Sequence, residues 1–382
     1  MSRHDLLGSC PESPVGSNMP STSYNAHSDS MSLLTRLRLT APIFQAPMAG
    51  VATPALAAAV SNAGGLGGLG VGTAGVEAAR KMVTEIQQLT SKAYNVNLFV
   101  HQTPNKPEPQ IDSAFLEALK PLYEDVKMES PKNLPEAALS FLDDQALLDL
   151  LLEMKPPVVS FHFGLPPPET IKRFKELGIV LMASATSLDE LHKVEEAGLD
   201  AVIAQGQEAG GHRGVFNPNG PDELISTFDL VRLFAKHTSL PIIAAGGIMD
   251  GRDINKALQA GATAAQLGTA FIPCPESTAD DGFRQALKQT RPEDTVFTRL
   301  VSGRPARGLN NRYTELEKKF GDTQIPDFPI GYKLTKALSA HAKKNGVEGY
   351  EARWAGTEAA RSRTMPAAEL VSVLLQEMEA SK

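Results

Sequence analysis

Cysteine is nearly absent from this sequence of 382 residues, which holds only Cys10 and Cys274. Two cysteines cannot form the disulfide framework that stabilises small secreted domains. Neither they nor the eight histidines follow the spacing of a metal site. The composition therefore predicts a protein of a reducing compartment without a bound metal.

Long apolar runs and an excess of positive charge are also missing. No run approaches the roughly 20 residues of a membrane-spanning helix. The formal net charge of −7 argues against binding to a phosphate backbone as the main function. We expect neither a membrane nor a nucleic acid as partner, and the sequence leaves the oligomeric state open.

Residues 1–32 have little apolar periodicity and are rich in Ser, Pro, Asn and Gly. Such a segment cannot bury enough surface to offset its ordering entropy, so we predict a disordered tail. It has no apolar core of a secretory signal, and Arg3 is the only Lys or Arg before Arg36. The expected location is cytoplasmic.

From Leu39 onward, short apolar strands alternate with helical patterns, which is typical of parallel βαβ units. Eight such strands fit a TIM (β/α)8 barrel better than an open sheet. The expected strands are 43–48, 66–70, 93–99, 158–163, 179–183, 201–205, 242–245 and 264–267. The expected helices between them are 54–62, 75–89, 135–154, 168–177, 188–197, 223–236 and 250–260.

A glycine motif from Gly65 to Gly70 matches the dinucleotide fingerprint G-x-G-x-x-G. That fingerprint requires a strand before it and a helix after it. Here an Ala-rich helical pattern precedes the glycines and a strand follows, so we do not expect a dinucleotide fold.

The domain prediction is a barrel over 33–275, interrupted by an insertion at 101–134 with a helix at 113–127. A long excursion after a barrel strand is either a lid or wall of the site, or a tolerated surface insertion. Beyond residue 275 the alternation stops. Residues 276–382 are expected to form a smaller, mainly helical substrate or lid region over the barrel mouth, with helices at 276–290 and 367–378.

Active sites of TIM barrels lie at the carboxyl ends of the strands, and unusual residues gather there in this chain. The sixth strand ends in Gln205 and leads into a glycine-rich turn that carries His212. Gly206, Gly210 and Gly211 leave no Cβ to hold a planar or anionic ligand away. The turn is either a binding loop or a glycine loop with a surface histidine.

The loops after strands seven and eight form the usual phosphate cradle of this fold. Gly246 and Gly247 follow the seventh strand, while Gly268 and the hydroxyl of Thr269 follow the eighth. These residues favour either a phosphate-bearing cofactor or a phosphorylated substrate.

Three further residues have alternative interpretations. His162, in the apolar context SFHFG, is either a pocket residue or a core histidine, and its place at a strand end favours the pocket. Met48 is compatible with plain core packing. Asn97 lies within an apolar strand, where a buried amide needs hydrogen-bond partners that a cofactor could supply.

On these motifs the chain resembles the nitronate monooxygenases, formerly called 2-nitropropane dioxygenases, which are FMN-dependent TIM-barrel enzymes. The resemblance runs from about Thr40 to the C-terminus. It rests on APIFQAPMAG, NVNLF, SFHFG, AQGQEAGGHRG, AAGGI and QLGTAF in the family's order, with GRPARGLNN and RWAG beyond them.

The resemblance implies a catalytic base at His212 and, at His162, the pocket histidine of the class I enzymes. The family's pocket Tyr and Lys residues are not placed, because Tyr313, Tyr332 and Tyr350 are spaced ambiguously. The implied FMN contacts are Pro47, Met48, Ala49, Asn97, Gln205, Gly210, Gly246, Gly247, Gln266, Leu267, Gly268 and Thr269.

The predicted function is FMN-dependent oxidation of alkyl nitronates, such as propionate 3-nitronate, by O₂ to a carbonyl compound and nitrite. One alternative is an FMN-dependent enoyl-acyl-carrier-protein reductase that uses NAD(P)H, from which SFHFG points away. The other is a non-catalytic barrel that binds a phosphorylated ligand.

Overall fold

The computed structural model describes residues 33–72, 74–104, 109–136 and 139–382. The predicted N-terminal tail lies outside these residues.

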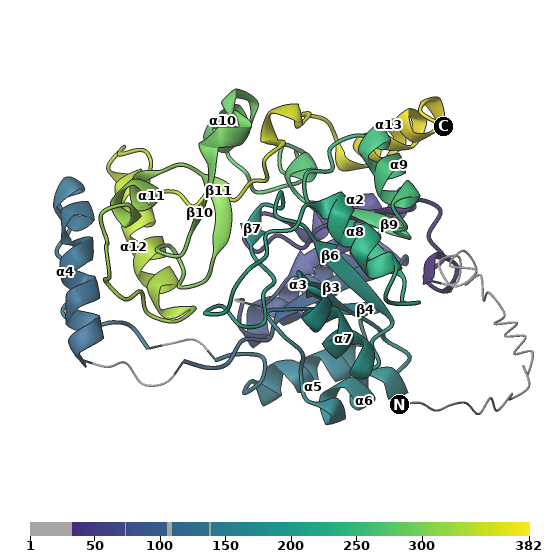
Figure 1. Ribbon diagram of the computed structural model, residues 1–382, viewed down its shortest axis with the longest axis horizontal. Coiled ribbons are helices and arrows are strands. Elements are labelled where there is room, and N and C mark those ends of the chain that lie inside the picture. The colour runs from purple at the N-terminus through teal and green to yellow at the C-terminus, as the bar shows by residue number, and fades with distance from the viewer. Residues whose placement is uncertain (1–32, 73, 105–108, 137–138) are drawn as a thin grey trace, which may run out of the picture.

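Eight parallel strands form the barrel, as the sequence predicts (Figure 1). Their order in the sheet is β1-β9-β8-β6-β5-β4-β3-β2. A parallel bridge between Phe44 and Leu66 then joins β1 to the residue just before β2, which closes the ring. The strands are β1 (Ile43–Gln45), β2 (Gly67–Gly70), β3 (Tyr94–Phe99), β4 (Val158–His162), β5 (Val180–Ala185), β6 (Ala201–Gln205), β8 (Ile242–Ala245) and β9 (Ala264–Leu267).

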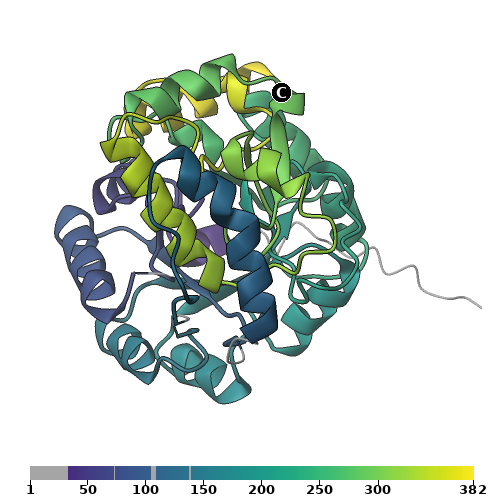
Figure 2. The ribbon, with the colours of Figure 1, turned by 90° about the vertical axis from the view of Figure 1, so that its left-hand side faces the viewer.

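Helices between the strands surround this sheet (Figures 1 and 2). Several begin at side chains that accept a hydrogen bond from the first helical turn, such as Thr53, Ser187 and Asp250. The barrel helices are α2 (Pro54–Asn62), α3 (Val76–Leu89), α5 (Gln145–Met154), α6 (Pro168–Glu176), α7 (Leu188–Glu196), α8 (Thr227–Ala235) and α9 (Gly251–Gln259).

The prediction that α5 starts at Pro135 is wrong. Asp144 is the N-cap, accepting from Leu147 N. Just before it, Phe141 N donates to Phe99 O at 3.4 Å, and the Ser140 hydroxyl donates to His101 O. Because these residues return to the end of β3, they cannot join the helix.

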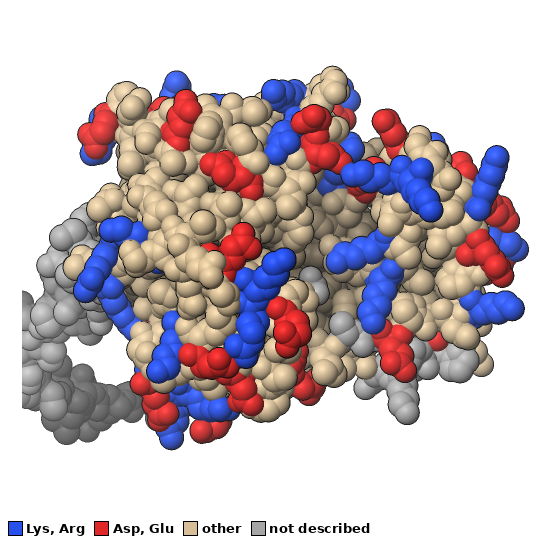
Figure 3. Space-filling view, turned by 180° about the vertical axis from the view of Figure 1, so that it is seen from behind, with Lys and Arg blue, Asp and Glu red and all other residues tan. Residues whose placement is uncertain are grey.

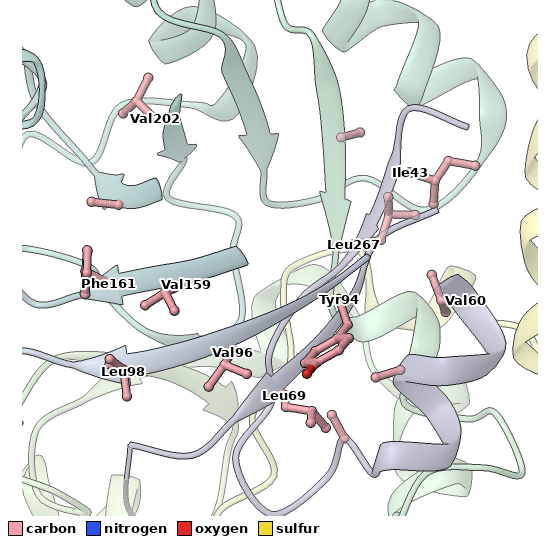
Figure 4. Close-up of a cluster of buried hydrophobic side chains, with 14 of the residues drawn as sticks. Ile43, Val60, Leu69, Tyr94, Val96, Leu98, Val159, Phe161, Val202 and Leu267 are labelled. Atoms are coloured by element: carbon pink, nitrogen blue, oxygen red, sulfur yellow. The ribbon is translucent and has the colours of Figure 1, made fainter. Parts of the chain in front are cut away.

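The core follows from the alternation of side chains along each strand. Val96 and Leu98 of β3 face the surrounding helices and join the large cluster of Figure 4. Asn95 and Asn97, one residue out of phase, are buried but are not members of this cluster. The interior of the barrel is therefore partly polar on β3.

The glycine motif at the start of β2 serves packing between α2 and the sheet. A Cβ on Gly67 would lie 1.9 Å from the backbone oxygen of Ala57 in α2. The helix precedes the glycines and the strand follows, as the sequence indicates. These glycines allow close backbone contact rather than phosphate binding.

A second hydrophobic cluster lies over the carboxyl ends of the strands. It joins α4 (Pro109–Asp125), from the insertion, to α12 (Ile330–Lys344), from the C-terminal region, through residues such as Phe115, Leu119 and Leu338. Figure 2 shows the two helices side by side in front of the ring of barrel helices. The insertion therefore packs with residues 300–350 of the C-terminal region, and these packed segments are called the lid below.

The lid also contains a small sheet that sequence analysis did not predict. β10 (Thr295–Thr298) pairs antiparallel with β11 (Ala306–Leu309), and β11 pairs with β7 (Gly211–His212) of the barrel's glycine-rich turn. The lid is thereby tied directly to His212. The remaining elements after β9 are η1 (Thr269–Phe271), α10 (Asp281–Gln289), η2 (Pro292–Asp294), α11 (Arg312–Glu317), η3 (Ala359–Arg361) and α13 (Ala367–Ala380).

The final helix, α13, lies against α9 and α2 on the barrel wall rather than in the lid (Figure 1). Gly251 N donates to a Glu377 carboxylate oxygen at 2.9 Å, and the Asn255 amide donates to Met378 O at 2.7 Å. The region after residue 275 is therefore divided between the lid and the barrel.

On the surface seen in Figure 3, acidic and basic side chains are interspersed. Among the described residues, no helix has the length and apolar character needed to cross a membrane.

Candidate active site

A pocket opens at the carboxyl ends of the barrel strands, beneath the lid. The predicted catalytic histidines, His162 and His212, line it together. So do the predicted cofactor residues, with one exception: Pro47, Met48, Ala49, Asn97, Gln205, Gly210, Gly246, Gly247, Gln266, Gly268 and Thr269.

Leu267 is the exception. Its side chain is 1% exposed and belongs to the core between sheet and helices (Figure 4). In β9, Gln266 faces the pocket, so its neighbour faces the opposite side of the sheet. The prediction that Leu267 takes part in the site is therefore not supported for its side chain.

Asn97 reaches the pocket from a chain of buried hydrogen bonds across β3 and β4. Asn95 Nδ2 donates to Ser160 Oγ, and Ser160 Oγ donates to Asn97 Oδ1, each at 2.8 Å. Ser160 is directly opposite Asn97 in the register. Because the amide oxygen of Asn97 is occupied, its NH₂ group is left to donate to a ligand.

His162 has both ring nitrogens engaged by the protein. Its Nε2 lies 3.1 Å from the backbone oxygen of His212, and its Nδ1 lies 2.9 Å from Ser184 Oγ. A carbonyl oxygen only accepts, so Nε2 carries the proton and Nδ1 accepts from the serine. Burial lowers the pKa of His162 to about 4, and the ring is neutral near pH 7.

His212 has one engaged nitrogen and one open nitrogen. Nε2 lies 2.8 Å from Ser302 Oγ, whereas no described residue hydrogen-bonds to Nδ1. Burial lowers the pKa of His212 to about 3, and the neighbouring His162 ring and the charge on Arg304 act in the same direction. The ring is therefore a neutral base whose free nitrogen belongs to a pocket-lining side chain.

The glycine-rich turn that carries His212 is held from inside the barrel. Gln205 Nε2 donates to His212 O at 3.0 Å, and Gln205 Oε1 accepts from Gly214 N at 2.7 Å. The fully buried Arg213 donates to Gln205 O and forms a two-bond ion pair with Asp222. These bonds fix the loop and place the His212 ring.

The loops after β8 and β9 present open backbone donors. Within the described chain, the N–H groups of Gly247, Ile248 and Gly268 donate to no protein acceptor, and all three residues line the pocket. Thr269 Oγ1 accepts from Gly356 N at 3.0 Å, which leaves its own proton for a ligand. Such a set of donors suits an anion.

Sequence reasoning missed the aromatic wall of the pocket, which comes partly from the end of β3 and partly from the lid. Phe99, Tyr332 and Trp354 line the pocket, and the rings of His212 and Trp354 lie 5.4 Å apart between centroids. The sequence does not place Tyr332, because spacing along the chain gives no sign of proximity. Ser184 and Glu358 also line the pocket and are not predicted from the sequence, whereas Ile248 and Gly356 lie in AAGGI and RWAG without a predicted contact.

Gly356, in the motif RWAG, contacts the glycine-rich turn at Gly210. A Cβ on Gly210 would lie 2.5 Å from the backbone nitrogen of Gly356. Gly210 is therefore a glycine because the segment after Trp354 packs against it. RWAG was noticed in the sequence, but its contact with the loop depends on the fold.

Arg304 is a buried cation next to the pocket histidines. Its guanidinium lies 4.3 Å over the Phe163 ring and donates to Val215 O at 2.7 Å. No described carboxylate forms an ion pair with it. Burial lowers the pKa of Arg304 to about 10, so it stays charged near pH 7. It provides positive potential at the site.

Within the described ranges, no group of three or more His, Cys, Asp or Glu side chains could hold a metal ion. Cys274 is buried, and burial raises the pKa of its thiol to about 12. The polar side chains that line the pocket carry imidazole, amide, hydroxyl and, at Glu358, carboxylate groups.

Fold and site together define a (β/α)8-barrel enzyme whose pocket combines donors for an anion with an uncharged imidazole. A family model described as nitronate monooxygenase matches residues 31–377. The chain belongs to this family and is an oxidoreductase.

Relatives named nitronate monooxygenase support the assignment. That of Paraburkholderia phytofirmans is 50% identical over 349 residues, covering 91% of this chain and 95% of the relative. That of Pseudomonas aeruginosa is 49% identical over 342 residues, covering 90% and 97%.

Solved structures show the same similarity in three dimensions. The nitroalkane oxidase of Streptomyces ansochromogenes has a TM-score of 0.82 and 37% identity, over 92% of this chain and 98% of that one. FabK of Thermotoga maritima has a TM-score of 0.68 and 28% identity, over 92% and 96%.

Proposed function

We propose that this protein binds FMN and oxidises alkyl nitronates with O₂ to a carbonyl compound and nitrite. Propionate 3-nitronate is the physiological substrate that we propose. The observation that carries the proposal is one pocket in which the neutral base His212 and the donors of Gly247, Ile248 and Gly268 occur together. Family membership supplies the reaction class.

The residues present fit FMN. A phosphate ester needs several donors and no bulky side chain in its way, which the open N–H groups and the Thr269 hydroxyl provide. The amide of Asn97 offers N–H donors to the polar edge of a ring system. When bound, the flavin supplies the electron transfer and the reaction with O₂.

The chain's own residues recognise the substrate and move its proton. A nitronate carries negative charge on its nitro oxygens, which the positive potential of Arg304 favours. A neutral nitroalkane must first lose its α-proton, and the open Nδ1 of His212 is the base for that step. The aromatic wall of Phe99, Tyr332 and Trp354 surrounds the organic part.

An FMN-dependent enoyl-acyl-carrier-protein reductase is the second candidate. The similarity to FabK favours it, at a lower TM-score and identity than the similarity to the nitroalkane oxidase. An enoyl reductase domain from Bacillus amyloliquefaciens matches at 13% identity and supports the fold alone. The two candidates differ in the reductant, because only the reductase requires NAD(P)H.

The test begins with the visible spectrum of the purified protein, which should show a flavin released as FMN by acid. Under anaerobic conditions, a nitronate should reduce the flavin and NADH should not. In air, nitronate should then give nitrite. Reduction by NADH with no response to nitronate would select the reductase instead, and a colourless protein that binds no added FMN would contradict both.

A further inference from the structure

Ser302 is a buried serine in the lid that reaches His212 from a distant part of the chain. Its side chain is 1% exposed. Its Oγ lies 2.8 Å from His212 Nε2. The same oxygen lies 3.4 Å from Arg304 N, which can only donate, and 3.3 Å from Arg304 O, which can only accept.

These neighbours constrain where the protons lie, because Ser302 has one hydroxyl proton. If this proton points at His212 Nε2, the serine makes two hydrogen bonds. It donates to His212 Nε2 and accepts from Arg304 N, while Arg304 O receives no hydrogen bond from it. If it points at Arg304 O, the serine accepts from both Arg304 N and His212 Nε2, and three bonds form. In a buried site, the arrangement that satisfies more groups is favoured.

We propose that Ser302 is a positioning residue that keeps the proton of His212 on Nε2 and so leaves the Nδ1 lone pair facing the pocket. This inference rests on the proposed function for its consequence, although the tautomer itself can be measured without any reaction. A base oriented by a third group is a recurring arrangement in enzyme sites.

The surrounding backbone fixes the serine. Gly303, next to it, has φ +97°, and a Cβ there would lie 2.4 Å from Pro326 O and 2.5 Å from Phe328 N. Only glycine allows this turn against the segment before α12. That segment carries Phe328, whose ring centroid lies 5.4 Å from that of His212. The turn and the ring of the base are therefore held by the same part of the lid.

The chemical consequence concerns the neutral nitroalkane. Its α-carbon–hydrogen bond breaks, and the proton forms a bond with His212 Nδ1. The electron pair of the broken bond becomes the carbon–nitrogen double bond of the nitronate. The resulting imidazolium donates through Nε2 to Ser302, so the serine keeps its hydrogen bond in both charge states. A pre-formed nitronate needs no such step.

Nitrogen-15 NMR of the FMN-loaded protein tests the tautomer directly. With labelled histidine, the spectrum of His212→Asn identifies the His212 signals by their loss. We expect wild type to show a protonated Nε2 and an unprotonated Nδ1, and Ser302→Ala to show a mixture of the two tautomers. A proton on Nδ1 in wild type, or an unchanged tautomer in Ser302→Ala, would overturn the proposal.

Kinetics test the consequence, with Ser277→Ala as matched control. Ser277 is also a buried serine that closes a turn, donating to Ile272 O and accepting from Ala279 N, but it contacts no histidine. We expect Ser302→Ala to lose roughly 10- to 100-fold in kcat/KM on neutral nitroalkane and less than about threefold on nitronate. Ser277→Ala should change neither.

Equal losses on both substrates in Ser302→Ala would show a general structural role and reject the positioning role. If wild type oxidises neither substrate, the proposed function fails, while the NMR result still decides the tautomer. Flavin absorbance and thermal unfolding of each variant show whether FMN binding and folding are intact.

Discussion

The Nε2 atom of His162 lies 3.1 Å from the backbone oxygen of His212, so one predicted catalytic histidine holds the loop that carries the other. Ser184 occupies the second nitrogen of His162. With both nitrogens bonded to protein, His162 has no free atom for proton transfer. Its side chain still lines the pocket and shapes it.

We therefore expect His162→Ala to retain FMN and to raise KM for nitronate roughly tenfold, because the His212 loop loses one anchor and the pocket widens. Steady-state kinetics and thermal unfolding measure the two effects separately. A loss of folding without a separable kinetic change would make His162 a core residue instead.

The rate on neutral nitroalkane should not depend on a histidine ionisation between pH 5 and 8. The pKa of His212 is lowered by burial to about 3, and the basic form is the one populated above the pKa. Activity should fall only as the pH approaches that value. The measurement is kcat/KM against pH, with His212→Asn expected to lose roughly 10² to 10⁴-fold throughout. A rise through pH 6 to 7 would show that the ring titrates near its ordinary pKa.

His101 should make the protein less stable in acid. It is 3% exposed, its ring nitrogens hydrogen-bond to no residue that the structure describes, and burial lowers its pKa to about 4. As the pH falls below about 6.5, the unfolded chain binds the proton first. The contribution to stability is thus present above pH 6.5 and is lost as the pH falls toward 4.

We expect His101→Phe, between the rings of Phe163 and Phe328, to reduce the difference in unfolding free energy between pH 7.5 and pH 5. The reduction should be on the order of 1 to 2 kcal/mol. Urea unfolding at the two pH values measures it, and His192→Gln, at an exposed position of α7, is the control. An unchanged difference in His101→Phe would show that His101 is protonated equally in both states.

Gly268 tests the cradle for the phosphate. Added to this residue, a Cβ would meet only Ala46 Cβ at 3.5 Å and Met48 Sδ at 3.9 Å, so the fold accepts it. Gly268→Val should remain folded and weaken FMN binding roughly tenfold or more, since its methyl groups occupy ligand space. Flavin fluorescence titration measures the affinity. Gly331→Ala, outside the pocket and equally free of clashes, is the control, and unchanged affinity in Gly268→Val would reject the cradle.

Arg304 should discriminate between charged and neutral substrates. Removing the charge in Arg304→Met should raise KM for the anionic nitronate roughly tenfold and change KM for neutral nitroalkane by less than about threefold. Arg304→Lys retains the charge over Phe163 and should recover most of the difference. Equal increases for both substrates in Arg304→Met would mean that the arginine serves packing alone.

The sequence by itself determined the barrel fold and predicted where its candidate site lies. Eight short apolar strands alternating with helices indicate parallel βαβ units, and the rule that sites lie at carboxyl strand ends predicts that His162, His212 and Gly268 lie together, as they do in the pocket. These inferences depend on local pattern and on one topological rule, so they hold without knowledge of long-range contacts. The start of α5 could not be predicted, because it depends on a long-range contact. Phe141 N donates to the backbone oxygen of Phe99, 42 residues earlier in the chain, which keeps Phe141 out of the helix.

Only the tertiary structure decided how the site works. Ser302, Tyr332 and Trp354 approach His212 from distant parts of the chain, and β11 pairs with β7 beside them, contacts that no local pattern records. The same packing brought α4 of the insertion against α12 of the lid. The pKa of His212 depends on burial by these distant segments and on the charge of Arg304. Desolvation and the distances between charged groups depend on which distant segments pack together, so they can be known only from the folded structure.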